Sequence, residues 1–514
     1  MAIYRVVGGG QGAGGTLPSL AAAVKVATTG DTVIVAPGVY KEALKLETPG
    51  VAWLSEEPWG AIIDGGWAGD SYDHEFSIQV GIGAANIQFS GFAIRNCEGR
   101  AFVAGNKARG SVIENLRIDN CGTSAFVLTD AVGVTVRGVV ATRLGMAWEA
   151  GRRPSVAGSV IMVRAEDCLI EECVVAYGHG EGIDIGRGSR NCVVRGCTIF
   201  DNSHLGLYFN RCVECIAEGN FIFLTGETRR NAGDEANWPA GIVFGDEGSE
   251  NMRTNPHSAG NVARGNVVVN CGTLLHVRNN KQNYDTLLDA GTRIENNTFV
   301  GGPLTRVGLA LDPNEAGRGP HRATIRGNVI EMSYAPGATA ARGVAGPRWE
   351  HNAWSRLPPI GVGTASDVTG ALGLTDPGAA LTNMFPEPGH SADLDAYRPT
   401  AGSPLIGAGP DGATLGALEP LPVEPPPVVD PPPPEPPPTP AGPDWDALRV
   451  LAVTSATQLS SAQVNVTEAQ KHTDAAAVLL NLSMLRLADA RQAQTDAASQ
   501  LAALLAALDE ARGA

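Results

Sequence analysis

The sequence predicts an all-β solenoid, in which short parallel strands are wound into stacked coils. One β-rich pattern occurs twice between Tyr177 and Asn220, and Cys168 and Cys192 lie 24 residues apart, as do Cys173 and Cys197. A fixed period of this size is typical of repeat architectures. The chain also contains 64 Gly but only 5% aromatic residues, which suits many turns around a narrow core of small apolar side chains.

The repeat extends over most of the chain when the strand after each corner is aligned. The first residues of these strands are Phe92, Leu116, Val139, Cys173, Cys197, Asn220, Asn266, Asn297, Asn328 and Asn352. Their separations are 24, 23, 34, 24, 23, 46, 31, 31 and 24 residues, so each is one coil or one coil plus a loop. Five corners use Asn at the same place, and we expect these amides to hydrogen-bond along the axis.

Before the first of these coils, the chain predicts a short strand at residues 2–7 and a helix from Leu17 to Thr28. Pro18 suits the first turn of such a helix. An open solenoid exposes its core and its strand edges at each end. We therefore expect the helix to cap the N-terminal end.

Each coil carries a further strand whose alternation separates an inward column from an outward one. The predicted inward residues are Phe102, Phe126, Ile161, Ile183, Leu207, Ile242, Leu275 and Leu309. The predicted outward residues are Val103, Val127, Met162, Asp184, Tyr208, Val243, His276 and Ala310. Coils of this length with parallel strands predict a three-sided β-helix.

The nine cysteines favour buried free thiols over a disulfide framework. Cys97, Cys121 and Cys271 each follow an Asn, at equivalent positions of their coils. Free Cys behaves as a small hydrophobic residue. Cys212 and Cys215 form a lone CxxC with no second pair to complete a zinc site.

Three segments resemble the right-handed parallel β-helix superfamily, which includes pectate-lyase-like enzymes and phage tailspikes. They are GDTVIVAPGVY at 30–40, the Gly-Asn corners, and DLDAYRPTAGSPLIGAG at 393–409 followed by Gly416-Ala417. The resemblance covers residues 1–419 and implies a right-handed solenoid. It says little about activity, because this scaffold hosts lyases, hydrolases, epimerases and binding proteins.

The composition then divides the chain into domains. Residues 1–419 form the β-helix domain, with a cap and first coils at 1–60 and a closing region at 360–419. Residues 420–443 contain 14 prolines and predict a polyproline linker with a reach of roughly 75 Å.

Residues 444–514 predict a helical segment. Apolar residues between Leu480 and Leu508 alternate steps of three and four, as in a coiled coil, with a polar break at Arg491 and Gln494. Oligomerisation through this segment is our preferred interpretation. A helical hairpin that folds on itself is the alternative.

The charge and hydropathy restrict the partners. A net charge of −16 argues against nucleic acid and anionic lipid. The chain contains no run of 18 apolar residues, so no membrane span is expected. The N-terminus lacks the features of a signal peptide. We therefore expect synthesis in a host cytoplasm followed by a role in a virion, or alternatively an extracellular protein whose signal has been removed.

The middle coils carry the candidate chemistry. The candidate catalytic residues are Glu181, Asp184, Asp201, His179 and His204. The candidate substrate-binding residues are Tyr208, Asn210, Arg187, Arg211, His276, Arg278, Lys281 and Trp238. Hydrolysis of a glycosidic bond needs two carboxyl groups, and a neighbouring His can move protons.

Three kinds of function remain open for this face. Our first hypothesis is a homotrimeric tailspike-like or fibre-like virion protein that binds, and in one version cleaves, cell-surface polysaccharide. It would contact other tail or capsid proteins through its C-terminal helix. The second is a polysaccharide hydrolase or lyase outside a virion. The third is a structural or decoration protein.

No cofactor is expected, except that a lyase of the pectate type would add calcium held by carboxylates. Arg187, Arg278 or Lys281 would then serve as the base.

Overall fold

The computed structural model describes residues 2–8, 16–68, 78–148, 159–226, 239–245, 258–278, 291–312, 323–343, 346–383 and 394–420. One compact unit comprises Met1–Leu381 and Leu394–Leu421, and a second comprises Thr382–Asp393 and Pro422–Ala514. Nearly all of the predicted linker, the whole predicted C-terminal helix, Trp238 and Lys281 lie outside the described residues.

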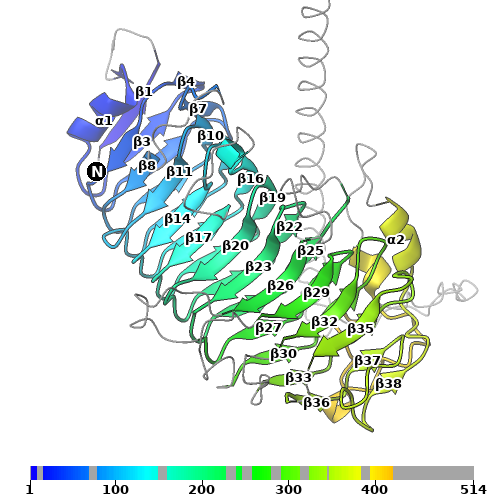
Figure 1. Ribbon diagram of the computed structural model, residues 1–514. Helices are drawn as coiled ribbons and strands as arrows, with labels where there is room; N and C mark the ends of the chain where they lie inside the picture. Colours follow the sequence, from blue (N-terminus) through cyan, green and yellow to red (C-terminus); the bar gives the residue numbers. More distant parts are fainter. Residues whose placement is uncertain are drawn as a thin grey trace, which may run out of the picture. The chain divides into compact units, whose positions relative to one another are not determined.

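The first unit is a solenoid of three parallel sheets (Figure 1). Sheet A contains β1 (Ile3–Val6), β2 (Thr16–Leu17), β3 (Thr32–Val35), β6 (Ala52–Ser55), β9 (Gln88–Ser90), β12 (Val112–Glu114), β15 (Thr135–Arg137), β18 (Leu169–Glu171), β21 (Val193–Arg195), β24 (Ile216–Glu218), β27 (Val262–Arg264), β30 (Arg293–Glu295), β33 (Thr324–Arg326) and β36 (Arg348–Glu350). Sheet B contains β4 (Gly38–Tyr40), β7 (Ala61–Asp64), β10 (Ala93–Cys97), β13 (Arg117–Cys121), β16 (Val140–Leu144), β19 (Val174–Gly178), β22 (Thr198–Phe200), β25 (Phe221–Phe223), β28 (Val267–Val269), β31 (Thr298–Val300), β34 (Val329–Glu331), β37 (Ala353–Trp354) and β38 (Val368–Thr369). Sheet C contains β5 (Leu44–Leu46), β8 (Ile78–Ile82), β11 (Arg100–Ala104), β14 (Phe126–Thr129), β17 (Val160–Val163), β20 (Glu181–Gly186), β23 (Leu205–Asn210), β26 (Ala240–Gly245), β29 (Thr273–Val277), β32 (Val307–Leu311) and β35 (Thr339–Gly343).

Each coil passes through sheets A, B and C in turn, and each strand pairs in parallel with the equivalent strand of the next coil. In Figure 1 the colour therefore changes steadily from blue to yellow along the stack. The prediction of a three-sided parallel β-helix is confirmed.

Few helices interrupt this pattern in the described residues. They are α1 (Leu20–Val26), α2 (Pro377–Asn383) and the 3₁₀ turns η1 (Met146–Trp148), η3 (Leu394–Tyr397) and η4 (Pro410–Gly412). Helix α1 is shorter than the predicted range, because the Ser19 side chain accepts a hydrogen bond from the Ala22 amide and caps the first turn. Leu17 belongs to β2 instead, while Leu20 and Ala23 are buried in the core shared with the coils.

The inward column of sheet C differs from the prediction at one coil. Val160 pairs with Phe126 and Ile183, so it occupies the inward place that we predicted for Ile161. Ile161 pairs with Val127 and Asp184 in the outward column, where we predicted Met162. Strand β17 reads Val-Ile-Met-Val, and an unbroken apolar run gives alternation nothing to distinguish its two faces.

The predicted Asn ladder is present at the corner between sheets A and B. Each Asn amide donates to the side-chain oxygen of the next: Asn220 to Asn266, Asn266 to Asn297 and Asn297 to Asn328 at 2.9 Å, and Asn328 to Asn352 at 3.0 Å. A second donor on Asn266 reaches the Ala217 carbonyl at 3.0 Å. The ladder is buried, so these bonds satisfy polar groups that water cannot reach.

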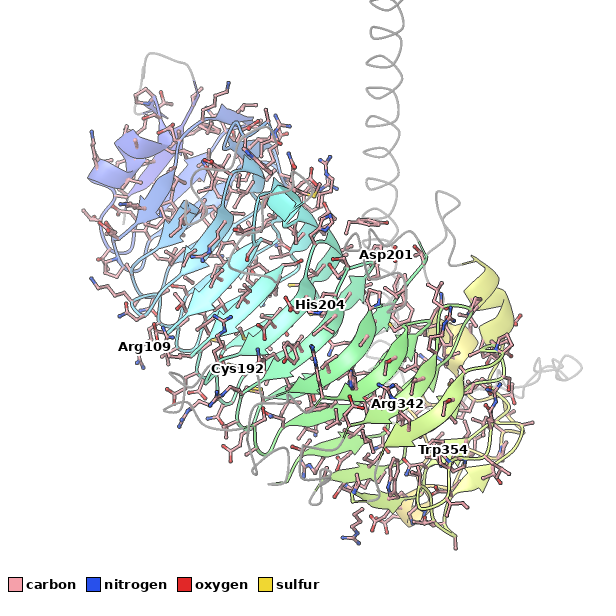
Figure 2. The ribbon with its side chains drawn as sticks, in the orientation of Figure 1. Arg109, Cys192, Asp201, His204, Arg342 and Trp354 are labelled. Atoms are coloured by element: carbon pink, nitrogen blue, oxygen red, sulfur yellow. The ribbon has the colours of Figure 1, made fainter. Side chains whose placement is uncertain are left out.

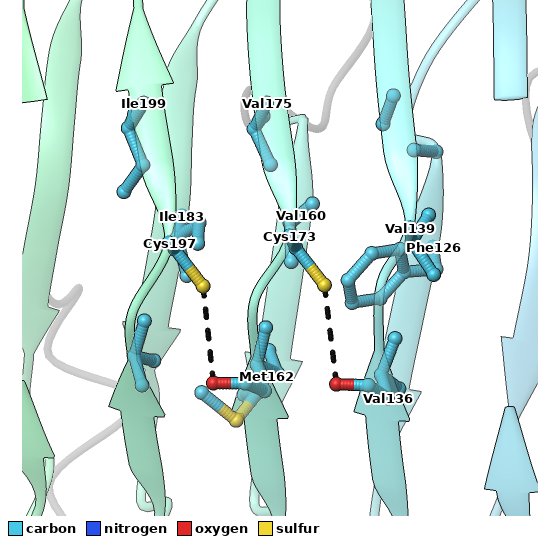
Figure 3. Packing of buried hydrophobic residues seen from close by; sticks show 14 of the residues in the cluster. Phe126, Val136, Val139, Val160, Met162, Cys173, Val175, Ile183, Cys197 and Ile199 are labelled. Carbon is cyan, nitrogen blue, oxygen red and sulfur yellow. Dashed lines mark hydrogen bonds between the residues drawn. The ribbon is translucent and has the colours of Figure 1, made fainter. Parts of the chain in front are cut away.

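All nine cysteines are free and buried, as predicted. Cys97 and Cys121 occupy paired positions of β10 and β13. The Cys173 thiol donates to the Val136 carbonyl of the preceding coil at 3.9 Å (Figure 3). The Cys197 thiol donates to the Ile170 carbonyl at the same distance. Burial and the neighbouring Cys197 thiol raise the pKa of Cys173, which keeps it protonated.

A ladder of opposite charges follows the outward side of sheet A. Nine consecutive strands carry Glu and Arg alternately, at Glu114, Arg137, Glu171, Arg195, Glu218, Arg264, Glu295, Arg326 and Glu350. Each Arg up to Arg326 forms an ion pair with the Glu of the preceding coil, at 2.5 to 3.1 Å. The sequence analysis missed this pattern because its members are 23 to 46 residues apart.

The segment predicted to close the domain returns along the outside of sheet B. Leu405 and Leu415 pack on Val329 and Ala353, which point away from the main core. The Ala417 amide then donates to Thr298 Oγ1 at 2.9 Å. Within the described part of the chain, no helix is long and apolar enough to cross a membrane.

Candidate functional site

The four longest connections between strands all border sheet C. Residues 145–159 and 224–239 precede β17 and β26, and residues 246–261 and 278–292 follow β26 and β29. In contrast, every connection from sheet A to sheet B is two residues long from β9 onwards. Because binding residues concentrate where a rigid scaffold carries additional loops, sheet C is the face on which to look for a site.

The outward column of sheet C changes from apolar to polar along the stack. Its members are Val103, Val127, Ile161, Asp184, Tyr208, Val243, His276, Ala310 and Arg342. Asp184 and Tyr208 are only 6% and 1% exposed although they point away from the core. Buried polar groups on an outward face are costly unless they serve a purpose, so these two coils hold the strongest candidates.

Glu181 and His204 form a pair where the chain enters sheet C. Glu181 Oε1 lies 3.0 Å from His204 Nδ1, and Glu181 is 7% exposed whereas the His204 side chain is 45% exposed. Among the described residues, no hydrogen bond reaches the buried Oε2 of Glu181. Burial acts to raise the pKa of Glu181, but the hydrogen bond and charge of His204 outweigh it and leave the pKa below the ordinary value. Glu181 is therefore an ionised carboxylate whose second oxygen is buried without a hydrogen bond among the described residues.

The corner that presents this pair is held from inside the solenoid. Asn202 Oδ1 accepts from the Gly178 amide at 3.0 Å, and Asn202 Nδ2 donates to the Val175 carbonyl at 3.1 Å. A Cβ at Gly178 would lie 2.1 Å from Ser159 Oγ, so only glycine fits between these two polar side chains. His179 follows directly and is half-buried, with its amide donating to the Leu144 carbonyl at 2.7 Å.

Two glycines let Asp184 and Tyr208 lie close against the sheet. A Cβ at Gly186 would be 2.9 Å from Asp184 Oδ1, and a Cβ at Gly245 would be 2.6 Å from Tyr208 Oη. Tyr208 thus leans across the next coil, where it packs with Val243. The orientation of both polar side chains depends on these neighbours lacking a side chain.

The other predicted residues lie either directly after a strand or at the end of a strand of sheet C. Asp201 follows β22 of sheet B with φ 48°, and its carboxylate accepts from the Thr225 amide at 2.8 Å and the Thr225 hydroxyl at 2.5 Å. These two hydrogen bonds connect neighbouring coils. Arg187 and Arg211 follow β20 and β23 with φ near 50°, and Arg187 is exposed whereas Arg211 is 1% exposed. Asn210 is buried and pairs with Gly186 and Gly245.

A second polar cluster lies farther along the same face. His276 Nε2 is 2.7 Å from Asp312 Oδ2, and Arg342 is 3.6 Å from Asp312 Oδ1. Arg278 occupies the strand position next to Asp312, because Val277 and Leu311 are paired. The hydrogen bond from His276 holds the pKa of Asp312 below its ordinary value, although burial acts to raise it.

His276 and Arg278 were predicted from the sequence as candidate binding residues, but Arg342 was not. Continuing the strand register through Thr339-Ala340-Ala341-Arg342 would have found it. Figure 2 labels His204 in the middle of the solenoid and Arg342 nearer its yellow end. Within the described ranges, no three His, Cys, Asp or Glu side chains gather as a metal site would need.

Comparisons with known proteins agree with this architecture. Residues 72–222 match the family described as right handed beta helix region. Together with the three parallel sheets, this match supports the fold of a right-handed parallel β-helix, and the predicted resemblance is confirmed at the level of the fold. No curated protein sequence matches the chain.

Several solved structures are similar at low identity. The pectate lyase Pel9A is 13% identical with a TM-score of 0.46, over 82% of this chain and 97% of that one. The A-module of the Azotobacter vinelandii mannuronan C-5 epimerase AlgE6 is 17% identical with a TM-score of 0.42, over 68% and 94%. The tailspike protein of E. coli bacteriophage HK620, in complex with a hexasaccharide, is 11% identical with a TM-score of 0.39, over 67% and 55%.

Proposed function

We propose that the outer face of sheet C binds a polysaccharide and cleaves its glycosidic bonds. The observation that carries this proposal is Glu181, a buried carboxylate with one oxygen on His204 and the other without a hydrogen bond among the described residues. Burying a carboxylate on the outward side costs desolvation of its charge; Glu114 and Glu295 of sheet A have an Arg partner there, whereas Glu181 has His204. A carboxylate that must act on a substrate has to be placed in this way.

The chemistry would use two carboxyl groups on one strand. Glu181 and Asp184 belong to β20, three residues apart. Since the pKa of Glu181 is lowered, Glu181 is the ionised partner and takes the role of base or nucleophile. His204 keeps Glu181 oriented, and Asp184 is the second carboxyl group that hydrolysis requires.

The side chains around Tyr208 support a carbohydrate ligand. Sugars present apolar ring faces and many hydroxyls, so their sites combine aromatic side chains with polar groups. Tyr208 lies beside Asp184 in paired strands, and Arg187 follows Asp184 on the exposed end of β20. A buried aromatic ring, a buried carboxyl and an exposed guanidinium thus lie within two coils.

The experiment is incubation of the full-length protein with a panel of neutral and acidic polysaccharides. A reducing-end assay detects hydrolysis, and ultraviolet absorbance detects the unsaturated products of a lyase. We expect cleavage of at least one polymer, and loss of that cleavage in Asp184→Ala. Cleavage that is unchanged in Asp184→Ala and in Glu181→Gln would place the site elsewhere. Binding without cleavage would reduce the proposal to a lectin-like function.

We place this activity on a tailspike-like or fibre-like virion protein that contacts cell-surface polysaccharide. In this proposal α1 caps the N-terminal end, residues 420–443 are a stiff linker, and residues 444–514 associate into a homotrimer that joins other virion proteins. The heptad steps between Leu480 and Leu508 support the trimer. Sedimentation of the full chain and of residues 1–419 tests it: a monomer in both cases contradicts the association.

A further inference from the structure

The outward face of sheet C becomes basic in its later coils, although the chain carries a net charge of −16. Among the described residues, two arginines and a histidine surround one carboxylate there. Arg278 and Arg342 flank Asp312, and His276 binds Asp312 directly. Nothing in the charge-paired ladder of sheet A resembles this excess, because there each Glu before Glu350 faces an Arg of the next coil.

The geometry of Asp312 leaves Arg342 available. Asp312 Oδ2 is 2.7 Å from His276, which is an ordinary hydrogen bond, whereas the 3.6 Å to Arg342 is too long for one. Among the residues that the structure describes, Asp312 is the only group paired with this guanidinium. The Arg342 side chain is 53% exposed, so its donors can reach an external acceptor.

We propose that His276, Arg278, Asp312 and Arg342 form a subsite for an anionic group, a carboxylate or a sulfate, on the ligand of sheet C. A guanidinium binds such groups with two parallel hydrogen bonds. Asp312 holds the imidazole of His276 and positions Arg342, but as a negative charge it also opposes the ligand. The subsite therefore selects for acidic over neutral glycans.

The position of the subsite fits a chain-like ligand that also reaches Glu181. His276 lies two strands beyond Tyr208 in the outward column and Arg342 lies four strands beyond. At roughly 4.8 Å per strand, these are distances of about 10 and about 19 Å along the axis. An extended oligosaccharide can span both sites. In this respect the inference rests on the proposed function.

The test compares two arginines that differ in face but not in charge. Arg342→Ala removes the proposed donor, and Arg348→Ala removes an exposed arginine of sheet A. Binding of the full-length protein is measured by calorimetry with free glucuronate, free sulfate, free glucose, and acidic and neutral oligosaccharides. We expect Arg342→Ala to weaken binding of the anionic ligands by about 10- to 100-fold, as for loss of a charged hydrogen bond. Arg348→Ala should change it by less than about twofold.

A second variant is expected to change the affinity for anions in the opposite direction. Asp312→Asn keeps an acceptor for His276 but removes the opposing charge, so it should tighten anion binding by a few fold. A purely structural role of Asp312 predicts weaker binding instead. The inference is wrong if free anions do not bind the wild type, or if Arg342→Ala and Arg348→Ala behave alike. Anion binding that depends on Arg342, in a protein that cleaves no polymer, would contradict only the proposed function. Cleavage of neutral polymers alone would contradict only the subsite.

Discussion

The outer faces of sheets A and C are built on the same coil repeat but differ in what they repeat. On sheet A one outward position alternates Glu and Arg over nine strands. Each Arg of this ladder forms an ion pair with the Glu of the preceding coil. On sheet C the equivalent column reads apolar, acidic, aromatic, apolar and basic in turn. A pattern that recurs in every coil stabilises the stack of coils. Residues that occur in only one coil are instead candidates for a site at that position.

Burial alone does not distinguish the carboxylates of the two faces. Glu114 and Glu295 of the ladder are 8% and 7% exposed, and Glu181 and Asp184 of sheet C are 7% and 6% exposed. The ladder carboxylates pair with Arg side chains that are about half exposed, whereas Glu181 pairs with His204. The two faces therefore differ in the partners of their buried carboxylates.

The sharpest test of this comparison uses one chemical change on both faces. Glu181→Gln should reduce cleavage by about 10²- to 10⁴-fold, the usual contribution of an acid–base group. Glu218→Gln, in the ladder, should leave the rate within about twofold because it loses only a surface ion pair. Initial rates with the polysaccharide found in the panel provide the measurement. Similar losses in both variants would contradict a functional difference between the faces.

A large effect on stability is expected at the corner between sheets A and B. Asn266→Ala removes the donor to Asn297 and the acceptor of the Asn220 amide, and it leaves buried polar groups unpaired. We expect a loss of about 2–4 kcal/mol in the free energy of unfolding. Urea unfolding followed by circular dichroism measures it. Asn106→Ala, at an exposed turn, is the control and should change stability by less than about 0.5 kcal/mol.

A smaller effect, confined to sheet C, is expected from Gly245→Ala. The new methyl group would lie 2.6 Å from Tyr208 Oη and force the ring to turn. A side chain driven away from its rotamer costs about 0.5–1.5 kcal/mol, which corresponds to roughly 2- to 10-fold in glycan affinity. Gly105→Ala is the matched control, since its Cβ would meet nothing within 4 Å. Equal affinities of both variants would show that Tyr208 does not contact the ligand.

The smallest effect is expected on sheet A. Arg137→Ala breaks one ion pair of a side chain that is 51% exposed, so it should cost only about 0.2–1 kcal/mol and less at high salt. Burial acts to raise the pKa of Glu114, but Arg137 and other partners hold it below the ordinary value. A lowered folded-state pKa stabilises the fold above the unfolded pKa of about 4.3 and loses this contribution as the pH falls.

The difference between the wild type and Arg137→Ala should therefore be full at neutral pH and shrink below about pH 4. Unfolding midpoints at several pH values measure it, with Lys107→Ala as an exposed control. A difference that grows in acid would contradict the assignment of the pair.

The repeat allowed much of the fold to be predicted, because its signals are periodic. The Asn corners, the buried thiols and most of the inward column of sheet C follow from spacing and alternation alone. The prediction from alternation failed at Ile161, because four successive apolar residues do not show which of them point inward. The Glu and Arg ladder was missed because its members come together only when the coils are stacked.

The candidate site shows the same division. The residue types in the middle coils could be recognised, and His204, Glu181, Asp184 and Tyr208 were named from the sequence. The contacts between these residues could not be predicted, because the contact between Glu181 and His204 depends on which coils are neighbours in the stack. Nor could the sequence separate Asp201, which joins its coil to Thr225, from the carboxyl groups on the outer face.

The sequence by itself therefore determined that this protein is a three-sided parallel β-helix and which coils depart from the repeat. Those properties reside in local spacing, and a chain with one coil period has one way to bury its apolar residues. Only the tertiary structure decided which polar groups meet, how deeply Glu181 and Asp184 are buried, and that Arg342 joins His276 and Asp312. These are properties of neighbouring coils, and short-range pattern carries no information about atoms that are brought together from 23 or more residues away.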